Sequence, residues 1–194
     1  RVSRSATPVC VKESSLKWEE TEVARRTRDN PELETKMMLT LRNIDAGSHH
    51  IVQLIDILQC DEWLYLICEC YDLTLLEHIA SKGARGEQET FRIFLELLDA
   101  VSFLHAHKIA HLDISTENIM LDLDGHVRVI DVGQATHFED DSELRGAYGK
   151  PAYYIPESAR DDPFCAFEQD VWAVGIVLFV LVVGTIPFQA PYVV

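Results

Sequence analysis

Apolar residues in the first part of the chain gather in three strand-like runs and one helical stretch. Residues 8–12 carry β-branched side chains that are typical of a strand, and residues 51–58 and 63–68 are two further apolar runs separated by a polar turn. The charged segment 14–43 is compatible with a helix, because after a proline start signal its apolar residues recur at helical spacing, at Leu33, Met37, Met38 and Leu41. We therefore predict that residues 1–71 form a small sheet with one helix.

Helical periodicity dominates the rest of the chain. Residues 87–107 carry an apolar stripe at i, i+3, i+4 and i+7 spacing, formed by Phe91, Phe94, Leu95, Leu98, Val101 and Leu104. Residues 119–121 and 127–130 are joined by a polar segment with Asp-Gly at its centre, which predicts a β-hairpin. Strands precede a helical region that contains one hairpin, so we predict an α+β fold in two lobes, at residues 1–71 and 72–194.

An uncharged segment of eighteen residues, 171–188, allows two interpretations. Its length lies at the lower limit for a transmembrane helix. However, Gly175, Gly184 and Pro187 interrupt it, and no bias of Lys or Arg flanks it. A buried core helix has the same composition, and we favour it over a membrane span.

The charge and the cysteine content narrow the function classes. With 17 basic and 32 acidic residues the net charge is −15, and no basic patch is visible, so we expect no nucleic-acid partner and no anionic membrane surface. The cysteines are odd in number and form no C-x-x-C pair, which argues against a disulfide framework or a zinc site and favours a reducing, cytoplasmic location. The chain begins at Arg1 without a signal peptide, and we expect it to be a fragment of a longer protein.

Candidate chemistry is concentrated around the predicted hairpin. Asp113 and Asn118 precede it, and Asp131, in an Asp-Val-Gly sequence, follows thirteen residues after Asn118. At this spacing a strand–loop–strand would gather two oxygen ligands for Mg²⁺ beside one carboxylate for a substrate hydroxyl. Taken singly, Asp and Asn are equally explained as caps of turns. The combined spacing is what favours a catalytic arrangement.

This spacing resembles the catalytic loop and the metal-binding loop of the eukaryotic protein kinase family, and the similarity extends from about residue 8 to about residue 188. The resemblance implies that Asp113 is the base or orienting group for the substrate hydroxyl, and that Asn118 and Asp131 hold Mg²⁺. Val-Cys-Val-Lys at residues 9–12 is similar to the V-A-I-K strand of the family. Lys12 would then contact the α- and β-phosphates of ATP and pair with Glu34 on the following helix.

The resemblance assigns roles to four further segments. Residues 64–71 are similar to the strand that enters the interlobe hinge, which implies that the backbones of Glu69 and Tyr71 bind adenine and that Cys68 occupies the gatekeeper position. His111 would be a packing residue that supports the catalytic loop. Residues 149–157 resemble the substrate-docking end of an activation segment, and Asp170 would hold the catalytic-loop backbone by hydrogen bonds.

Several positions depart from the family pattern. Leu112 replaces an arginine that receives an activation-loop phosphate, so we expect no dependence on phosphorylation of that loop. Ser115 stands where Ser/Thr kinases place a lysine, and Lys150 stands where they place a threonine. We hypothesise a swap, in which Lys150 reaches back to supply the missing ammonium group. Val132 replaces the Phe of D-F-G and can still pack, and no G-x-G-x-x-G precedes residue 12.

The resemblance implies an intracellular kinase that uses ATP and Mg²⁺ to phosphorylate Ser/Thr hydroxyls of protein substrates. The preference for Ser/Thr follows from Ser-Thr-Glu-Asn at 115–118, which is closer to the K-P-E-N of Ser/Thr kinases than to the tyrosine-kinase version. One alternative is a pseudokinase that acts as a non-catalytic binding or scaffold module, which Ser115 and Val132 favour. A small-molecule phosphotransferase of the same fold is a third, which the Pro-Glu at 156–157 disfavours.

Overall fold

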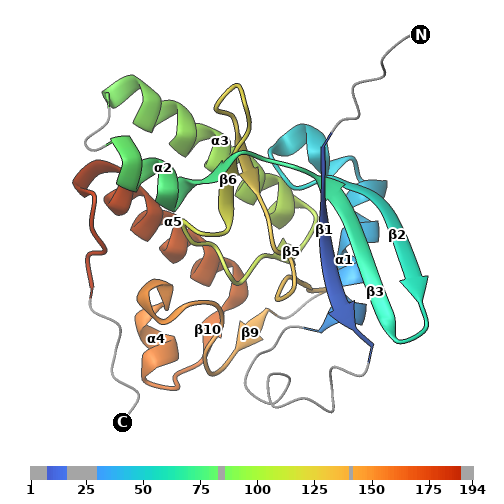
Figure 1. Cartoon of the computed structure of the whole chain (residues 1–194). Helices are drawn as coiled ribbons and strands as arrows, with labels where there is room; N and C mark the ends of the chain where they lie inside the picture. Colours follow the sequence, from blue (N-terminus) through green and yellow to red (C-terminus); the bar gives the residue numbers. More distant parts are fainter. Residues whose placement is uncertain (1–7, 17–29, 83–85, 140–141, 189–194) are drawn as a thin grey trace, which may run out of the picture.

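The computed structural model describes residues 8–16, 30–82, 86–139 and 142–188. Figure 1 shows a small antiparallel sheet and helix α1 at one side of the molecule and a mainly helical part at the other. The first part consists of β1 (Val9–Ser15), α1 (Pro31–Asn43), the short helix η2 (Ala46–His49), β2 (Leu54–Cys60) and β3 (Trp63–Glu69).

The second part is built mainly from helices, with short paired strands between them. Its helices are α2 (Leu75–Lys82), α3 (Glu87–Ala106), η3 (Pro151–Tyr153), α4 (Pro156–Ala159) and α5 (Ala166–Val183). Its strands are β4 (Leu73–Thr74), β5 (Ile109–Ala110), β6 (Ile119–Leu121), β7 (Val127–Val129), β8 (Thr136–His137), β9 (Glu143–Leu144) and β10 (Phe164–Cys165). The α+β architecture is as predicted, and so is the hairpin, which is β6–β7.

The sheet of the first part has the order β1–β3–β2, and all its pairs are antiparallel. In the β1–β3 register Lys12 lies opposite Leu66 and Cys10 lies opposite Cys68. Side chains two residues apart share a face, so Cys10 and Lys12 point to the same side of β1. Leu64 and Leu66 on the central strand are buried, which makes this side the inner face of the sheet.

Helix α1 is shorter than the helical stretch predicted from residue 14. Strand β1 continues to Ser15, and the helix begins only at Pro31, where Asn30 caps it by accepting hydrogen bonds from the backbone N–H groups of Glu32 and Leu33. Residues 17–29 lie outside the described part of the chain. The helix begins at the proline that the sequence offered as a start signal.

The predicted stripe on α3 was partly wrong. Phe91, Leu95 and Leu98 are exposed, and the buried side of the helix consists of Ile93, Leu97, Ala100, Val101 and Leu104. The helix carries large apolar residues on two sides, so spacing alone could not select the side that packs inward. The packing partners decide, since α3 lies between β7, η2 and α5.

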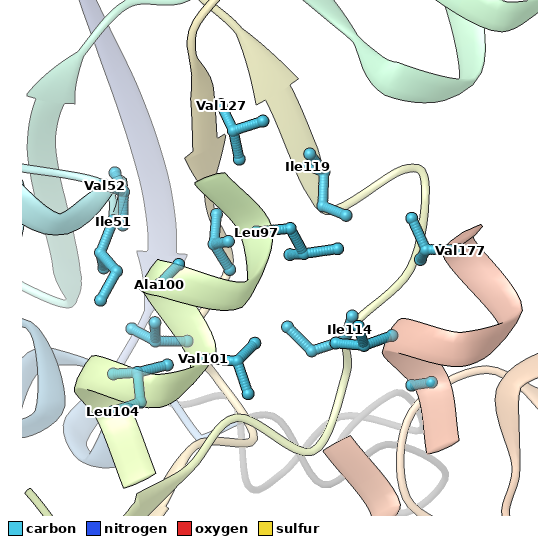
Figure 2. Close-up of a cluster of buried hydrophobic side chains, with 14 of the residues drawn as sticks. Ile51, Val52, Leu97, Ala100, Val101, Leu104, Ile114, Ile119, Val127 and Val177 are labelled. Carbon is cyan, nitrogen blue, oxygen red and sulfur yellow. The ribbon is translucent and has the colours of Figure 1, made fainter. Parts of the chain in front are cut away.

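One continuous hydrophobic core joins the two parts. Figure 2 shows Ile51 and Val52 close to α3, with Ile114, Ile119 and Val177 on its other side. The segment that precedes β2 is also bonded to the second part, because the N–H of Val52 donates to the carbonyl of Val129 at 2.8 Å. The packing therefore fixes the sheet against the hairpin, and the space between them becomes the candidate site.

Helix α5 contains most of the uncharged segment. In the described part of the chain it is the one helix long and apolar enough to cross a membrane, and 50% of that window is buried. Its inner side contacts α3 and β5. Its other side is exposed, at Val171, Val182 and Val183 among others, so the helix packs on one side only and is not buried all round as we expected of a core helix.

Candidate active site

Asp170 at the start of α5 holds the loop that carries Asp113. Its carboxylate is completely buried and accepts hydrogen bonds from the backbone N–H groups of His111 (2.7 Å) and Leu112 (2.8 Å), and it lies 2.9 Å from Nε2 of His105. Leu112 has a positive φ of 65°, which costs a non-glycine residue about 1–2 kcal/mol. The two bonds to Asp170 offset that cost and fix the direction of the next residue.

We expect the substitution Asp170→Asn to lower the free energy of unfolding by about 2 kcal/mol, because an amide turns one acceptor into a donor that faces a buried N–H. Urea denaturation monitored by circular dichroism measures the change. Glu168→Gln, on the exposed side of the same helix turn, is the matched control. An unchanged urea midpoint for Asp170→Asn would show that the loop does not depend on this carboxylate.

Asn118 orients Asp113. The side-chain N–H₂ of Asn118 donates to Oδ2 of Asp113 at 2.7 Å and to its backbone carbonyl at 2.9 Å. The other carboxylate oxygen, Oδ1, is buried and accepts no hydrogen bond from the described residues. Burial raises the pKa of Asp113, although the charge of Lys150 opposes the shift. An oriented carboxylate with one oxygen that accepts no hydrogen bond is suited to accept one from a hydroxyl.

Lys12, Glu34 and Asp131 form a charged cluster beside this loop. Nζ of Lys12 lies 2.7 Å from Oε1 of Glu34 and 3.1 Å from Oδ1 of Asp131. Burial alone would lower the pKa of Lys12, but the two carboxylates raise it, so the side chain stays protonated at neutral pH. Burial likewise disfavours the ionised form of Asp131, yet Lys12 holds the pKa of Asp131 below its usual value. The cluster therefore presents one ammonium and two carboxylates.

The β6–β7 hairpin brings the loop of Asp113 and Asn118 next to the charged cluster of Lys12, Glu34 and Asp131. The N–H of Ile130 donates to the carbonyl of Asn118 at 2.9 Å, so Asp131 follows directly at the side of Asn118. Asp131 has a positive φ of 60°, which turns the chain at this point, and its Oδ1 also accepts a long hydrogen bond, 3.4 Å, from the N–H of Gly133. The two predicted metal ligands thus lie just outside the paired strands, Asn118 directly before β6 and Asp131 two residues after β7.

A cleft of about 360 Å³ lies between the sheet and the hairpin. This volume is within the range of small-molecule sites. Lys12, Glu34 and Asp131 lie at its charged end, and Leu66, Met120 and Ile130 are among its apolar walls. A flat apolar ring would fit the apolar walls, and the ammonium of Lys12 is the cation at the charged end that an anionic group could contact.

Comparisons with known proteins agree with this arrangement. The family model described as the protein kinase domain matches residues 3–192. The chain belongs to the protein kinase family. It is 38% identical over 152 residues to the human liver/testis phosphorylase b kinase gamma catalytic chain, covering 74% of this chain and 37% of that protein. It is 30% identical over 168 residues to the serine/threonine-protein kinase SIK2 of Gallus gallus, covering 86% and 21%.

A plant relative has the same percentage identity to this chain as SIK2 has. The CBL-interacting serine/threonine-protein kinase 17 of Arabidopsis thaliana is 30% identical over 154 residues, which cover 77% of this chain and 36% of that protein. The chain thus spans less than two fifths of the length of these relatives. The family membership and the α+β kinase fold predicted from the motifs are confirmed.

In this kinase-family chain, Lys150 lies where the swap hypothesis requires it. Nζ of Lys150 donates to Oγ of the buried Ser115 at 2.8 Å and lies 3.6 Å from Oδ1 of Asp113. Gly149 makes the approach possible, because a Cβ at this position would lie 2.8 Å from the carbonyl oxygen of Leu112. The ammonium of Lys150 thus lies beside Ser115 and Asp113, and the swap of roles stays a prediction.

Gln134 was not singled out from the sequence. Its side-chain oxygen accepts the backbone N–H of Gly149 at 3.0 Å, which ties the segment of Lys150 to the turn after Asp131. A glutamine one residue after Asp-x-Gly carries no recognisable signal, since its role depends on a segment fifteen residues away.

Two supporting residues behave as expected of packing groups. His111 is fully buried, accepts the N–H of Asp113 at Nδ1 (3.3 Å) and places Nε2 3.1 Å from the carbonyl of Ile130. It therefore connects the catalytic loop to the hairpin through its ring. Val132 is 1% exposed, so the smaller side chain still packs in the core.

The hinge residues lie at the wall of the cleft. Glu69 and Tyr71 both line it, and the hydroxyl of Tyr71 donates to Oε2 of Glu69 at 3.1 Å. The N–H of Glu69 donates to the carbonyl of Gln53 at 3.1 Å, and Glu69 lies opposite Val9 in the β1–β3 register. Their role in binding adenine stays a prediction.

Proposed function

We propose that the chain is the core of an ATP- and Mg²⁺-dependent protein kinase that phosphorylates Ser/Thr hydroxyls. One observation carries the proposal: the cluster of Lys12, Glu34 and Asp131 lies beside the loop of Asp113 and Asn118, at the charged end of one cleft. Phosphoryl transfer depends mainly on positioning and on cations that offset phosphate charge, and this arrangement can provide both.

The donor set fits Mg²⁺. Asn118 uses its N–H₂ group on Asp113, which leaves its amide oxygen as a ligand, and Asp131 offers an ionised carboxylate. Few protein oxygens beside phosphate and water are typical of Mg²⁺ sites. Bound there, the ion would offset charge on the phosphates, while Lys12, held by Glu34, would bind them directly.

Asp113 and Lys150 would act on the acceptor. The open Oδ1 of Asp113 would accept the hydroxyl proton of a serine or threonine and aim its oxygen at the γ-phosphorus. The ammonium of Lys150, which lies 3.6 Å from Oδ1 of Asp113, would stabilise the negative charge on the transferring group. The net charge of −15 favours basic protein substrates. The five free thiols suit a reducing compartment such as the cytoplasm.

The alternative is a non-catalytic module with the same fold. Ser115 in place of the family lysine is the observation that favours it, since the catalytic loop itself then carries no cation. The presence of Lys150 at the same place favours the enzyme.

Transfer of labelled γ-phosphate to a basic protein tests the proposal. The chain is incubated with ATP and Mg²⁺, and label on serine and threonine is expected, with none when a chelator removes the metal. Binding of ATP without any transfer would favour the pseudokinase, and labelling of a small alcohol alone would favour the small-molecule phosphotransferase.

Gln134 is expected to act as a positioning residue. In Gln134→Ala the N–H of Gly149 loses its partner, Lys150 becomes less well placed, and we expect kcat to fall by about tenfold with little change in the KM for ATP. Steady-state kinetics measure this split, and Gln134→Glu, which keeps the acceptor oxygen, should restore most of the rate. Equal changes in kcat and in the KM for ATP would contradict a role through Lys150.

A further inference from the structure

Two cysteines face each other across the inner side of the sheet. In the antiparallel register of β1 and β3, Cys10 is the direct partner of Cys68. Both line the cleft, and Cys10 lies on the same side of its strand as Lys12, whose ammonium reaches the charged end. The two thiols therefore lie on one surface and point into one cavity.

The spacing of directly opposed residues suits a covalent bond between them. Cα atoms of such pairs lie about 4.5 or 5.5 Å apart, depending on the hydrogen-bonding pattern, and disulfides need about 4.4–6.8 Å. We propose that Cys10 and Cys68 form a redox-modification site, which a low-molecular-weight disulfide such as oxidised glutathione converts into a Cys10–Cys68 disulfide within the cleft.

The two thiols differ in reactivity, which sets the order of the steps. Cys10 is exposed, whereas Cys68 is half-buried, and burial together with the charges of Cys10 and Glu34 raises the pKa of Cys68 to about 11. The thiolate of Cys10 attacks the oxidant first, forming a mixed disulfide and releasing one small thiol. The thiolate of Cys68 then attacks Sγ of Cys10 and releases the second. Two protein thiols lose two electrons in total, and the small disulfide gains them, together with the two protons, as two thiols.

The other cysteines of the chain have no such arrangement. Cys60 lies at the far end of the sheet opposite Trp63, and Cys165 lies 3.2 Å from the hydroxyl of Ser142. Cys70 also lines the cleft but follows the end of β3, outside the paired register. These three cysteines provide controls, because they carry the same thiol group but do not lie opposite another cysteine on a paired strand.

A bond at this place would alter the apolar end of the cleft. On the basis of the proposed function, a bound nucleotide would cover the two thiols and slow their oxidation, and the oxidised chain would bind nucleotide more weakly than the reduced chain. In a reducing compartment the bond would be transient, as expected of a regulatory disulfide.

The test uses the reduced chain and oxidised glutathione. After alkylation of the remaining thiols, mass spectrometry without reduction is expected to find a peptide pair linked through Cys10 and Cys68. Cys10→Ser and Cys68→Ala should abolish the link, and Cys60→Ser, Cys70→Ser and Cys165→Ser should keep it. Between pH 7 and 9 the rate at which the mixed disulfide on Cys10 converts into the Cys10–Cys68 disulfide should rise about tenfold per pH unit. The reason is that the thiolate fraction of Cys68 rises in this way below its pKa.

Other outcomes overturn the inference. A chain that stays unlinked, that links through Cys70, or that stops at a mixed disulfide on Cys10 would exclude the opposed pair as a modification site. A separate arm adds ATP and Mg²⁺ at saturating concentration, and at least fivefold slower linking is expected. Linking at an unchanged rate would contradict the nucleotide cleft of the proposed function and would leave the cysteine pair supported.

Discussion

The substitution Asp113→Asn is expected to reduce the rate of phosphoryl transfer by about 10²–10⁴-fold, the range that a positioned general base contributes. The amide keeps the size of the side chain and can still accept the hydrogen bond that Asn118 donates to Oδ2 at 2.7 Å. It cannot accept a proton, and it places an N–H₂ group where Oδ1 now lies buried, 3.6 Å from the ammonium of Lys150. The loss should therefore fall on the chemical step.

Three measurements separate this role from a structural one. The melting temperature and the affinity for ATP with Mg²⁺ should change little, and kcat should carry nearly the whole effect. Asp99→Asn is the matched control, since this aspartate lies half-exposed on α3 and pairs with His49. A variant at residue 113 that keeps more than a third of the wild-type kcat would show that the carboxylate does not act on the acceptor hydroxyl.

The fold was largely predictable because its elements carry strong local signals. The β6–β7 hairpin followed from two apolar runs around an Asp-Gly turn, and Gly125 at the turn has the positive φ of 80° that such a turn requires. The side of α3 that faces the core was not predictable in the same way. Phe91 and Leu95 are as apolar as Ile93 and Leu97, and only the neighbouring elements decide which pair is buried.

The candidate site was likewise predictable only in part. Lys12, Asp113, Asn118 and Asp131 were found because the resemblance fixes their spacing, and the structure brings them to one region of the molecule. Their conformations were not readable from the sequence. Leu112 and Asp131 both have positive φ values, which local preference disfavours for such residues. The N–H of Leu112 donates a hydrogen bond to the carboxylate of Asp170, 58 residues further on, and this long-range contact holds the positive φ of Leu112, so local sequence could not predict it.

The most informative departure from the family is the exchange of positions between Ser115 and Lys150. Replacing Lys150 by methionine keeps the length of the side chain and removes the ammonium. We expect kcat to fall by about 10²–10³-fold, or about 3–4 kcal/mol of transition-state stabilisation, by analogy with the loss of other preorganised donors. Stability should change little, because the side chain is one third exposed and exposed ion pairs contribute at most about 1 kcal/mol.

A second variant distinguishes electrostatic catalysis from loop packing. If the ammonium itself matters, returning it to the catalytic loop in the double variant Ser115→Lys/Lys150→Thr should recover at least tenfold of the rate lost in Lys150→Met. A role for Lys150 in packing alone predicts no such recovery, because the threonine leaves the same space unfilled. Unchanged turnover in Lys150→Met would show that the lysine only faces solvent near Ser115, and catalysis would then have to proceed without a cation at this position.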